Sequence, residues 1–332
     1  MSLRVKVIGK TDKGLVRSGN EDYIHIDEDH HIYAVCDGMG GHQAGEVASM
    51  TASETILKAF AHFGDALSKD PGLSFGRTLP PNGDLLLRAI RLANRTIYSM
   101  ALQDQALTGM GTTVVAVALE ADIMSVAHVG DSRAYCLRER SLEPLTRDHS
   151  WVAEMQEKQN ISLAEANSVI GKNVITRALG VRETVEIDYR IVKIAPGDLF
   201  ILCSDGLCGF ADDDEIFDVA SKFRDDLKKL TENLVQMAND RGGSDNVSVV
   251  AIQIEEVSES PLPDLEVFTL KEEDQPTLEA EDAWVEKFAE MNTRIAEESS
   301  RSPARGISPL LLVAIFVLFA LVAVLVIWMQ GN

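Results

Sequence analysis

The chain lacks several features that would assign it to common classes of protein. Lys and Arg number 31 against 52 Asp and Glu, and the net charge of −21 excludes a general nucleic-acid binder, because phosphate backbones require a basic surface. The opening residues, MSLRVKVIGK, contain no apolar core long enough for a secretory signal, so we expect none. The four cysteines form no CxxC pair, and Cys36 and Cys203 lie inside apolar runs, which indicates buried free thiols in a reducing compartment.

Residues 1–255 alternate between strand-like and helix-like stretches, with no internal repeat. Runs rich in Val and Ile predict strands at Ile32–Cys36, Thr113–Leu119, Ile123–His128, Ala134–Leu137, Val185–Ile194, Leu199–Cys203 and Val247–Ile254. Apolar periodicity predicts helices at Gly45–Phe63, Leu85–Gln105, Trp151–Gln159, Asp213–Ala220 and Asp226–Asp240. The second and third strands are close in sequence, which favours an antiparallel hairpin.

A glycine-rich stretch, YAVCDGMGGHQAGE, joins the first of these strands to the first helix. It lacks the Gly-Lys-Ser/Thr ending of a nucleotide P-loop. It also places Gln43 where a dinucleotide fingerprint requires a small residue. Because glycine allows a ligand to approach the backbone closely, we interpret the glycines as serving the acid that precedes them, Asp37.

Acids recur at the ends of apolar runs. Asp-Gly after a strand is an ordinary turn signal, but several such acids in one domain indicate a shared site: Asp37, Asp131, Asp205 and Asp245. Carboxylates gathered in one cleft repel one another unless a cation neutralises them. Oxygen ligands without a matching His or Cys cluster suit Mg²⁺ or Mn²⁺ rather than structural zinc.

The C-terminal part of the chain has a different character. Residues 256–309 are acidic and dotted with proline, which predicts a disordered linker with at most a short helix around Trp284–Ile295. Residues 310–329 carry no charge and are long enough for a transmembrane helix, since twenty helical residues span roughly 30 Å. Arg301 and Arg305 precede this span, so we expect a tail anchor with residues 1–255 on the cytoplasmic side of the membrane.

Eight motifs in order resemble the metal-dependent protein phosphatases of the PP2C (PPM) family, in their bacterial form. They are RSGNED, CDGMGGHQAGE, GMGTTVVAV, AHVGDSRAY, LTRDHS, NVITRALG, CSDGLCGF and RGGSDNVSVV. The resemblance covers residues 14–250 and neither the linker nor the tail. It implies an α+β fold, a four-layer α-β-β-α sandwich of two antiparallel sheets flanked by helices, with metals in a cleft at one end.

The resemblance also implies roles for individual residues. Asp37 would bridge two Mn²⁺ or Mg²⁺ ions, the Gly38 carbonyl would complete one ion, and Asp205 and Asp245 would complete the other. Glu21 and Asp22 would act around the metals through water, and Asp131 would help to hold a third, weaker ion. Arg17 would clamp the substrate phosphate with its planar guanidinium. A hydroxide shared by the two metals would attack phosphorus in line, which releases phosphate from phosphoserine or phosphothreonine proteins.

The sequence departs from the eukaryotic pattern Asp-Gly-His-Gly-Gly at Met39, where a proposed general acid would stand. His42 is nearby, but a histidine at a helix start is more often structural. Arg133 and Arg177 are expected to pair with acids inside the protein rather than to bind phosphate. Residues 147–182 align with the variable flap of the family, which suggests a role in substrate choice.

These observations predict a membrane-tethered Ser/Thr protein phosphatase that opposes a Ser/Thr protein kinase. Two alternatives remain open. One is a catalytically inactive adaptor that retains the fold; the presence of every metal acid of the family pattern argues against it. The other is a phosphatase narrowed to a single regulatory protein, although the motifs match the general bacterial type better.

Overall fold

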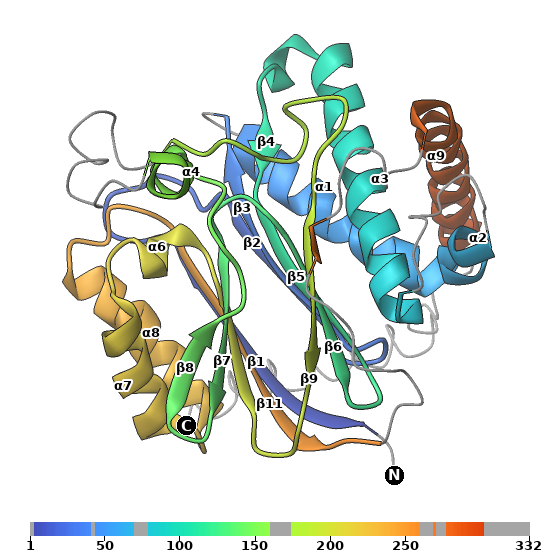
Figure 1. Ribbon diagram of the computed structural model, residues 1–332. Coiled ribbons are helices and arrows are strands. Elements are labelled where there is room, and N and C mark those ends of the chain that lie inside the picture. Colours follow the sequence, from blue (N-terminus) through green and yellow to red (C-terminus); the bar gives the residue numbers. More distant parts are fainter. Residues whose placement is uncertain are drawn as a thin grey trace, which may run out of the picture. The chain divides into compact units, whose positions relative to one another are not determined.

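The computed structural model describes residues 3–40, 44–69, 79–159, 174–258, 268–269 and 277–301. The chain divides into two compact units, Met1–Val285 and Glu286–Asn332. In the second unit the described residues are those of helix α9 (Leu278–Arg301) from Glu286 onward. The first unit contains both sheets and every predicted site residue, and the remaining description concerns it (Figure 1).

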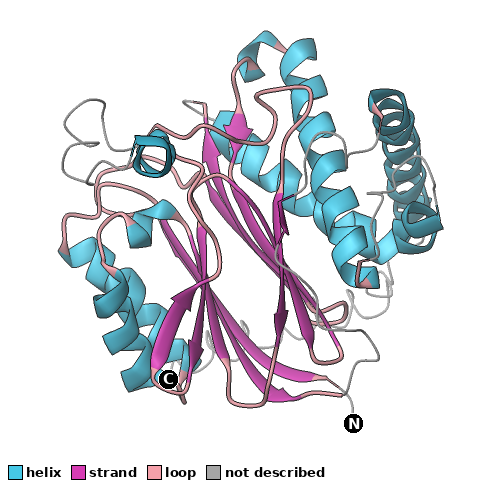
Figure 2. Cartoon of the chain, viewed as in Figure 1, coloured by secondary structure: helices cyan, strands magenta, loops and turns pink. Residues whose placement is uncertain are grey.

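Two antiparallel sheets form the centre of the first unit (Figure 2). One has five strands in the order β1 (Arg4–Asp12), β11 (Val247–Glu256), β10 (Leu199–Cys203), β7 (Arg133–Arg138) and β8 (Ser141–Pro144). The other has the order β12 (Phe268–Thr269), β9 (Asp188–Lys193), β6 (Ile123–Val129), β5 (Val114–Glu120), β3 (Ile32–Met39) and β2 (Asp22–Asp27). A short strand, β4 (Gly111–Thr112), also pairs with β3.

Helices cover the outer faces of the two sheets (Figure 1). Helices α1 (Ala44–Lys58) and α3 (Pro81–Gln103) pack on β3 and β5, and α1 continues through a π-helical turn, Ala59–Phe63, to α2 (Gly64–Lys69). Helices α7 (Asp213–Phe223) and α8 (Leu227–Asp240) pack on the five-stranded sheet, beside the short α6 (Asp205–Cys208). Helix α4 (Trp151–Gln159) lies in the predicted flap.

The apolar runs fold as strands because both faces of each central strand are buried. In β10, Phe200 and Leu202 join the cluster between the two sheets, whereas Leu199 and Ile201 face the cluster shared with α7 and α8. Successive side chains of a strand point to opposite faces, so a strand buried on both sides reads as a continuous apolar run. The predicted four-layer α-β-β-α fold is confirmed, and Cys36 and Cys203 are buried free thiols as predicted.

Three sequence predictions need correction or qualification. Strands β1 and β2 were missed; β1 alternates charged and apolar residues and exposes one face, unlike the continuous apolar runs that predicted the other strands. The predicted strand Val185–Ile194 is shorter in the structure, where β9 begins at Asp188. The linker contains α9, a 24-residue helix rather than a short one around Trp284–Ile295.

The predicted transmembrane span, residues 310–329, lies outside the described residues. Within the part of the chain that is described, no helix combines the length and the apolar character needed to cross a bilayer.

Candidate metal centre

Strands β2 and β3 place two acids opposite each other. Asp22, the first residue of β2, pairs in register with Asp37 near the end of β3. The backbone around Asp37 is fixed by Thr113, whose hydroxyl accepts from the Asp37 N–H at 3.1 Å and whose N–H donates to the Asp37 carbonyl at 2.8 Å. Ser132 lies 2.8 Å from the same Thr113 hydroxyl. The position of Asp37 is therefore set by the sheet and by two hydroxyl side chains.

The five-stranded sheet contributes Asp205 from its end of the sandwich. β10 ends at Cys203, and Asp205 opens α6. Ser204, between them, donates to Asp22 Oδ2 at 2.8 Å and accepts from the Ser248 N–H at 3.0 Å. These bonds join residues of both sheets, so the site lies where the two sheets meet.

Arg17 and Asp245 form a pair at the edge of this group. Arg17 Nη2 lies 2.9 Å from Asp245 Oδ2, and the Arg17 side chain is half exposed. Asn246 holds the loop between β1 and β2, because its amide nitrogen donates to the carbonyls of Lys13 and Gly19 at 2.9 Å each and its oxygen accepts from the Glu21 N–H at 2.8 Å. Arg17 therefore lies half exposed beside Asp245, a predicted metal ligand. Asp205 is a second predicted ligand; burial raises its pKa, and the charge of Arg17 lowers it.

The glycines of the opening motif allow chain segments to approach closely. A Cβ on Gly38 would lie 2.1 Å from the Gly45 carbonyl oxygen and 2.6 Å from that of Glu21. A Cβ on Gly45 would lie 2.5 Å from Glu21 Oε2, so the Glu21 carboxylate rests against the start of α1. Any larger residue at these positions would separate α1 from the two strands that carry the acids.

Asp131 follows β6 and completes the group. His149 fixes the preceding residue, Gly130, by accepting from its N–H with Nδ1 at 3.1 Å and donating its own N–H to the Gly130 carbonyl at 2.9 Å. The charge of Asp131 raises the pKa of Asp37, and that of Asp205 raises the pKa of Asp131. The structure thus brings together five of the predicted acids: Asp22, Asp37, Asp131, Asp205 and Asp245.

Burial and mutual repulsion raise the pKa values of four of these acids: Asp22, Asp37, Asp131 and Asp205. Burial, with the charges of Asp205 and Asp245, raises the pKa of Asp22 to about 7 even though Ser204 and Ser248 lower it. Burial and the charge of Asp205 raise the pKa of Asp131 to about 7. The pKa of Asp37 lies well above its ordinary range, mainly because of burial and then the Asp22 charge. Such shifts are typical of carboxylates that a cation neutralises in the working protein.

The donors present fit divalent metal ions. Asp22 Oδ1 is buried and makes no hydrogen bond to any described residue, which is unusual for a carboxylate oxygen. The surrounding ligand atoms are oxygens, which Mg²⁺ and Mn²⁺ prefer. We therefore assign this group as the candidate metal centre. Residues 41–43, with His42, lie outside the described residues.

A second group, His128, His149 and Asp188, also has ligand atoms within 4.8 Å of one another. The sequence analysis did not single it out. The two rings are stacked 18° from parallel, so their in-plane lone pairs do not converge. Arg177 already lies 2.9 Å from Asp188 Oδ1, and His128 Nε2 lies 2.7 Å from the Arg147 carbonyl. These contacts favour a structural role, and Arg177 is paired with acids as predicted.

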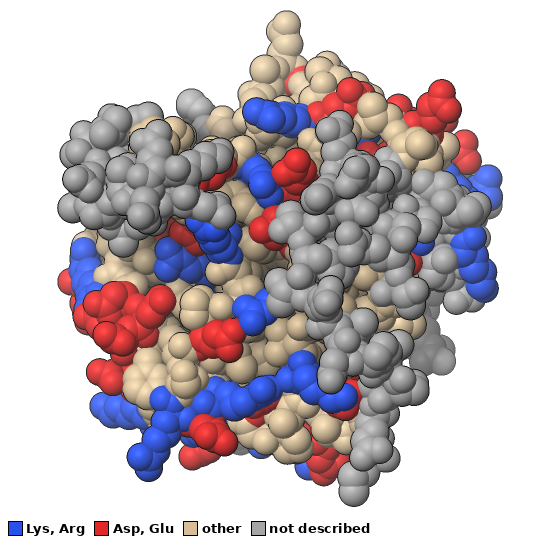
Figure 3. Space-filling model, in the orientation of Figure 1, with Lys and Arg blue, Asp and Glu red and all other residues tan. Residues whose placement is uncertain are grey.

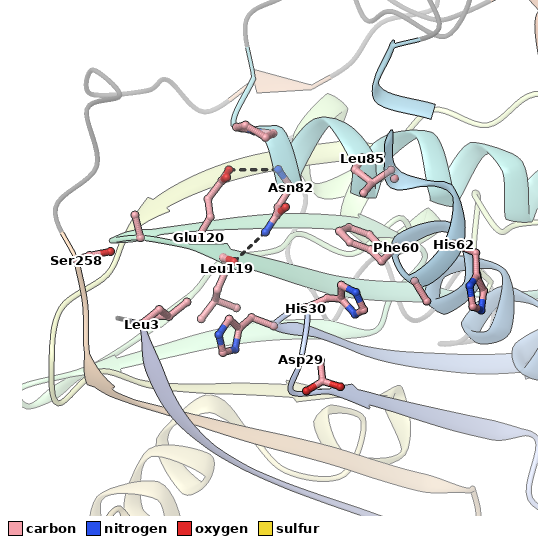
Figure 4. Close-up of a pocket in the computed structure, with 15 residues that line it drawn as sticks. Leu3, Asp29, His30, Phe60, His62, Asn82, Leu85, Leu119, Glu120 and Ser258 are labelled. Carbon is pink, nitrogen blue, oxygen red and sulfur yellow. Dashed lines mark hydrogen bonds between the residues drawn. The ribbon is translucent and has the colours of Figure 1, made fainter. Parts of the chain in front are cut away.

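A cavity of about 760 Å³ lies at the other end of β3 from Asp37 (Figure 4). Its wall includes the β2–β3 turn and the start of α3, where Asn82 donates to the Leu119 carbonyl at 3.1 Å and, through its N–H, to Glu120 at 3.3 Å. None of the predicted site residues lines it. The acids, and not this cavity, therefore define the functional site.

Comparison with known proteins agrees with this geometry. A family profile described as "Protein phosphatase 2C" matches residues 16–248. The serine/threonine phosphatase stp of Listeria monocytogenes is 34% identical over 247 residues, which span 74% of this chain and 94% of the relative. The serine/threonine protein phosphatase PstP of Mycobacterium tuberculosis is 33% identical over 257 residues, 76% of this chain and 46% of the relative.

Solved structures show the same fold. The crystal structure of M. tuberculosis PstP/Ppp superposes with a TM-score of 0.64 at 32% identity, covering 76% of this chain and 99% of that one. The PstP catalytic domain, in complex with 2 manganese ions, gives 0.64 at 31% identity, covering 77% and 100%. The S. agalactiae serine/threonine phosphatase gives 0.68 at 33% identity, covering 76% and 100%. The chain belongs to the protein phosphatase 2C family.

The first prediction follows from the competition between protons and Mn²⁺ for the same carboxylates. The pKa values of Asp22 and Asp131, about 7, exceed the ordinary 3.8, so between about pH 4 and 7 the folded chain binds more protons than the unfolded chain. The free energy of unfolding contributed by these two acids therefore falls as the pH rises through that window. We expect Mn²⁺ to raise the melting temperature more at about pH 8 than at about pH 5.5, because protons no longer compete for the ligands.

Differential scanning fluorimetry with chelator or Mn²⁺ at each pH measures this difference. Asp22→Asn should reduce the pH dependence of the Mn²⁺ effect, whereas Asp214→Asn, at the exposed start of α7, should not. An equal Mn²⁺ effect at both pH values would show that the acids do not bind the ion.

Proposed function

We propose that this chain is a Mn²⁺- or Mg²⁺-dependent protein serine/threonine phosphatase that acts at the cytoplasmic face of a membrane. The observation that carries the proposal is the buried group of acids that raise one another's pKa beside a half-exposed arginine, Arg17. Relatives named as serine/threonine phosphatases, and a relative's structure with 2 manganese ions, support the same activity.

The residues of the site divide into ion-holding and substrate-holding groups. Asp37, the Gly38 carbonyl, Asp205 and Asp245 would hold two cations, which when bound would lower the pKa of a water molecule and so supply the nucleophile. Glu21 and Asp22 would surround them, and Asp131 would bind a third ion. Strands β2 and β3 carry Asp22 and Asp37, and the start of α6 carries Asp205, which favours pre-organised stabilisation of the charge on the transferred phosphoryl group.

Arg17 would orient the substrate phosphate. Its guanidinium is held by Asp245 on one side and by the Ser244 carbonyl at 3.3 Å from Nε, and the rest of its fork faces solvent. A planar fork can hold two phosphate oxygens at once. On the face that Figure 3 shows, Lys and Arg side chains are interspersed with Asp and Glu, so the attraction for phosphate would come from the site itself rather than from the general surface.

Membrane location is part of the proposal. It is supported by the uncharged residues 310–329 and by the two arginines that precede them in sequence, Arg301 and Arg305. A tether would raise the effective concentration of the enzyme at substrates on the same membrane. A Ser/Thr protein kinase would be the natural opposing partner.

The activity itself gives the second prediction. The full-length protein in detergent should hydrolyse p-nitrophenyl phosphate and phosphoserine or phosphothreonine peptides when Mn²⁺ or Mg²⁺ is present, and should stop when chelator is added. Asp37→Asn should bring turnover to background, because it removes the shared ligand. A folded wild-type protein that is inert with both substrates and both ions would favour the inactive adaptor instead.

Substitution of Arg17 gives the third prediction. Arg17→Ala should raise KM roughly 10- to 100-fold with a smaller change in kcat, since a charge-assisted hydrogen bond contributes about 1.5–3 kcal/mol. Arg4→Ala is a matched control, because Arg4 is also exposed and paired with acids, at the opposite end of β1. Steady-state kinetics that show equal KM values for the Arg17 and Arg4 variants would remove Arg17 from the phosphate site.

The tail gives the fourth prediction. Deletion of residues 310–329 should move the protein from the membrane pellet to the supernatant in cell fractionation, without lowering the rate on p-nitrophenyl phosphate. The control is a chain in which the same residues are replaced by an unrelated apolar helix of equal length. Sedimentation with membranes after the deletion would contradict the tail anchor.

A further inference from the structure

Helix α3 carries a buried polar face beside the metal-binding half of the sandwich. Arg91, Asn94 and Arg95 are each at most 5% exposed, and Asn94 and Arg95 lie three and four residues after Arg91, on the same side of the helix. A buried guanidinium needs a counter-charge and hydrogen-bond acceptors, because an unpaired buried charge is strongly unfavourable. The partners of these three side chains therefore show which parts of the chain are bound to this face of α3.

One set of partners is the backbone of residues 180–185, here called the 180–185 segment. Arg91 Nη1 donates to the Val185 carbonyl at 3.0 Å, and Arg95 Nη1 donates to that of Glu183 at 3.4 Å. Asn94 makes three bonds. Its amide nitrogen donates to the carbonyls of residues 182 and 183 at 3.2 and 3.0 Å, and its oxygen accepts from the Gly180 N–H at 2.9 Å.

The other partners come from the first turns of α9. Glu281 pairs with Arg91, and both side chains are 2% exposed. Asp282 pairs with Arg95. Only one carboxylate oxygen of Glu281 contacts Arg91. The other is buried without a hydrogen bond to any described residue, so Arg91 is the partner toward which this carboxylate points. The family match ends at residue 248, before α9 begins, so these counter-charges come from outside the phosphatase 2C region.

The 180–185 segment continues to the metal centre. Leu179 exchanges two backbone hydrogen bonds with Thr112 of β4, at 2.8 and 3.1 Å, and the Thr112 hydroxyl donates to the Asp37 carbonyl at 2.9 Å. Gly180 has φ +82°, and a Cβ there would lie 2.2 Å from Ile97 of α3, so the segment has one close-fitting position. A displacement of the 180–185 segment would therefore also displace β4 and the backbone of Asp37.

A cavity of about 800 Å³ adjoins this contact, and its wall includes Arg91, Val181, Arg182, Thr277 and Leu278. The start of α9 and the 180–185 segment thus line one cavity as well as sharing the arginines of α3. Residues 177–182 are also the end of the predicted flap, the part of the fold expected to contribute to substrate choice.

We propose that Glu281 and Asp282 are positioning residues: by neutralising Arg91 and Arg95, the start of α9 holds the 180–185 segment against β4 and Asp37. The working catalytic unit then extends to Val285 and not to residue 255, and the segment preceding the predicted membrane anchor is part of it. Only the consequence for turnover rests on the proposed phosphatase function, and the positional role is tested without it.

Hydrogen exchange of the full-length protein in detergent tests the proposal. Glu281→Gln keeps the shape and one acceptor but leaves Arg91 without its counter-charge. We expect amides of residues 179–183 and of Thr112 to exchange at least about tenfold faster, while those of β5 and β6 keep their rates. Glu279→Gln, at an exposed position of the same helix, is the matched control and should change neither set.

Kinetics provide an independent readout. If the segment positions substrate, Glu281→Gln should raise KM for a phosphopeptide by a larger factor than it lowers kcat. Asp282→Asn is a milder second variant, because Asp282 is 56% exposed, and it should accelerate exchange in the same residues by a smaller factor. An inactive wild-type protein would refute the proposed function and leave the exchange result standing.

Two outcomes would overturn the proposal. One is wild-type exchange at residues 179–183 and Thr112 in both variants. The other is acceleration spread evenly over the whole of both sheets, which would show that the ion pairs support the general fold rather than this segment.

Discussion

The structure depends on one unfavourable arrangement, the burial of several carboxylates in a single place. Asp22, Asp37, Asp131 and Asp205 are each displaced from their ordinary pKa by burial and by one another. Hydrogen bonds from Ser204 and the nearby charge of Arg17 offset only part of this repulsion. Cations bound at this place, as we propose, would relieve the repulsion and so link the stability of the fold to its chemistry.

The rest of the sandwich serves to hold these acids in place. Asp22 and Asp37 come from paired strands of one sheet, whereas Asp205 and Asp245 flank β10 and β11 of the other. Ser204 and Ser248 connect the two sets across the sandwich. Because the apolar clusters between and outside the sheets are continuous, repulsion at one end is opposed by burial along the whole length of the strands.

The sequence predicted the acids better than it predicted their supports. An acid beside an apolar run is a local signal, and it pointed to Asp37 near the end of β3, to Asp131 and Asp205, which follow β6 and β10, and to Asp245, which precedes β11. The hydroxyls that support these acids carry no such signal: Ser132 lies 2.8 Å from the Thr113 hydroxyl, and Ser204 donates to Asp22. Asn246 was missed, although it anchors the loop between β1 and β2 at three points, because its partners are backbone atoms more than 220 residues away.

The same dependence on contacts between distant residues explains why the length of α9 was not predicted. Its composition resembles a solvated linker, since acids and alanines outnumber large apolar residues. Its start is joined to the folded unit by burial of Trp284 and by the pairing of Glu281 with Arg91, 190 residues apart, and no local pattern can reveal such a pairing. Buried arginines on α3 were the available signal: a helix whose periodic face includes Arg91 and Arg95 requires acids from another part of the chain.

Because the chain is acidic, bound cations would have a second role, which is to attract the negatively charged substrate. A phosphorylated substrate carries negative charge toward a protein with 52 acids and 31 basic residues, and toward a site that contains five carboxylates. Without bound ions such a site would repel the group that it must hold, and Arg17, already paired with Asp245, offers only part of the compensation. In the proposed function, the charge that would relieve repulsion among the acids is the same charge that would admit the phosphate, so folding of the site and recognition of the substrate would depend on one electrostatic balance.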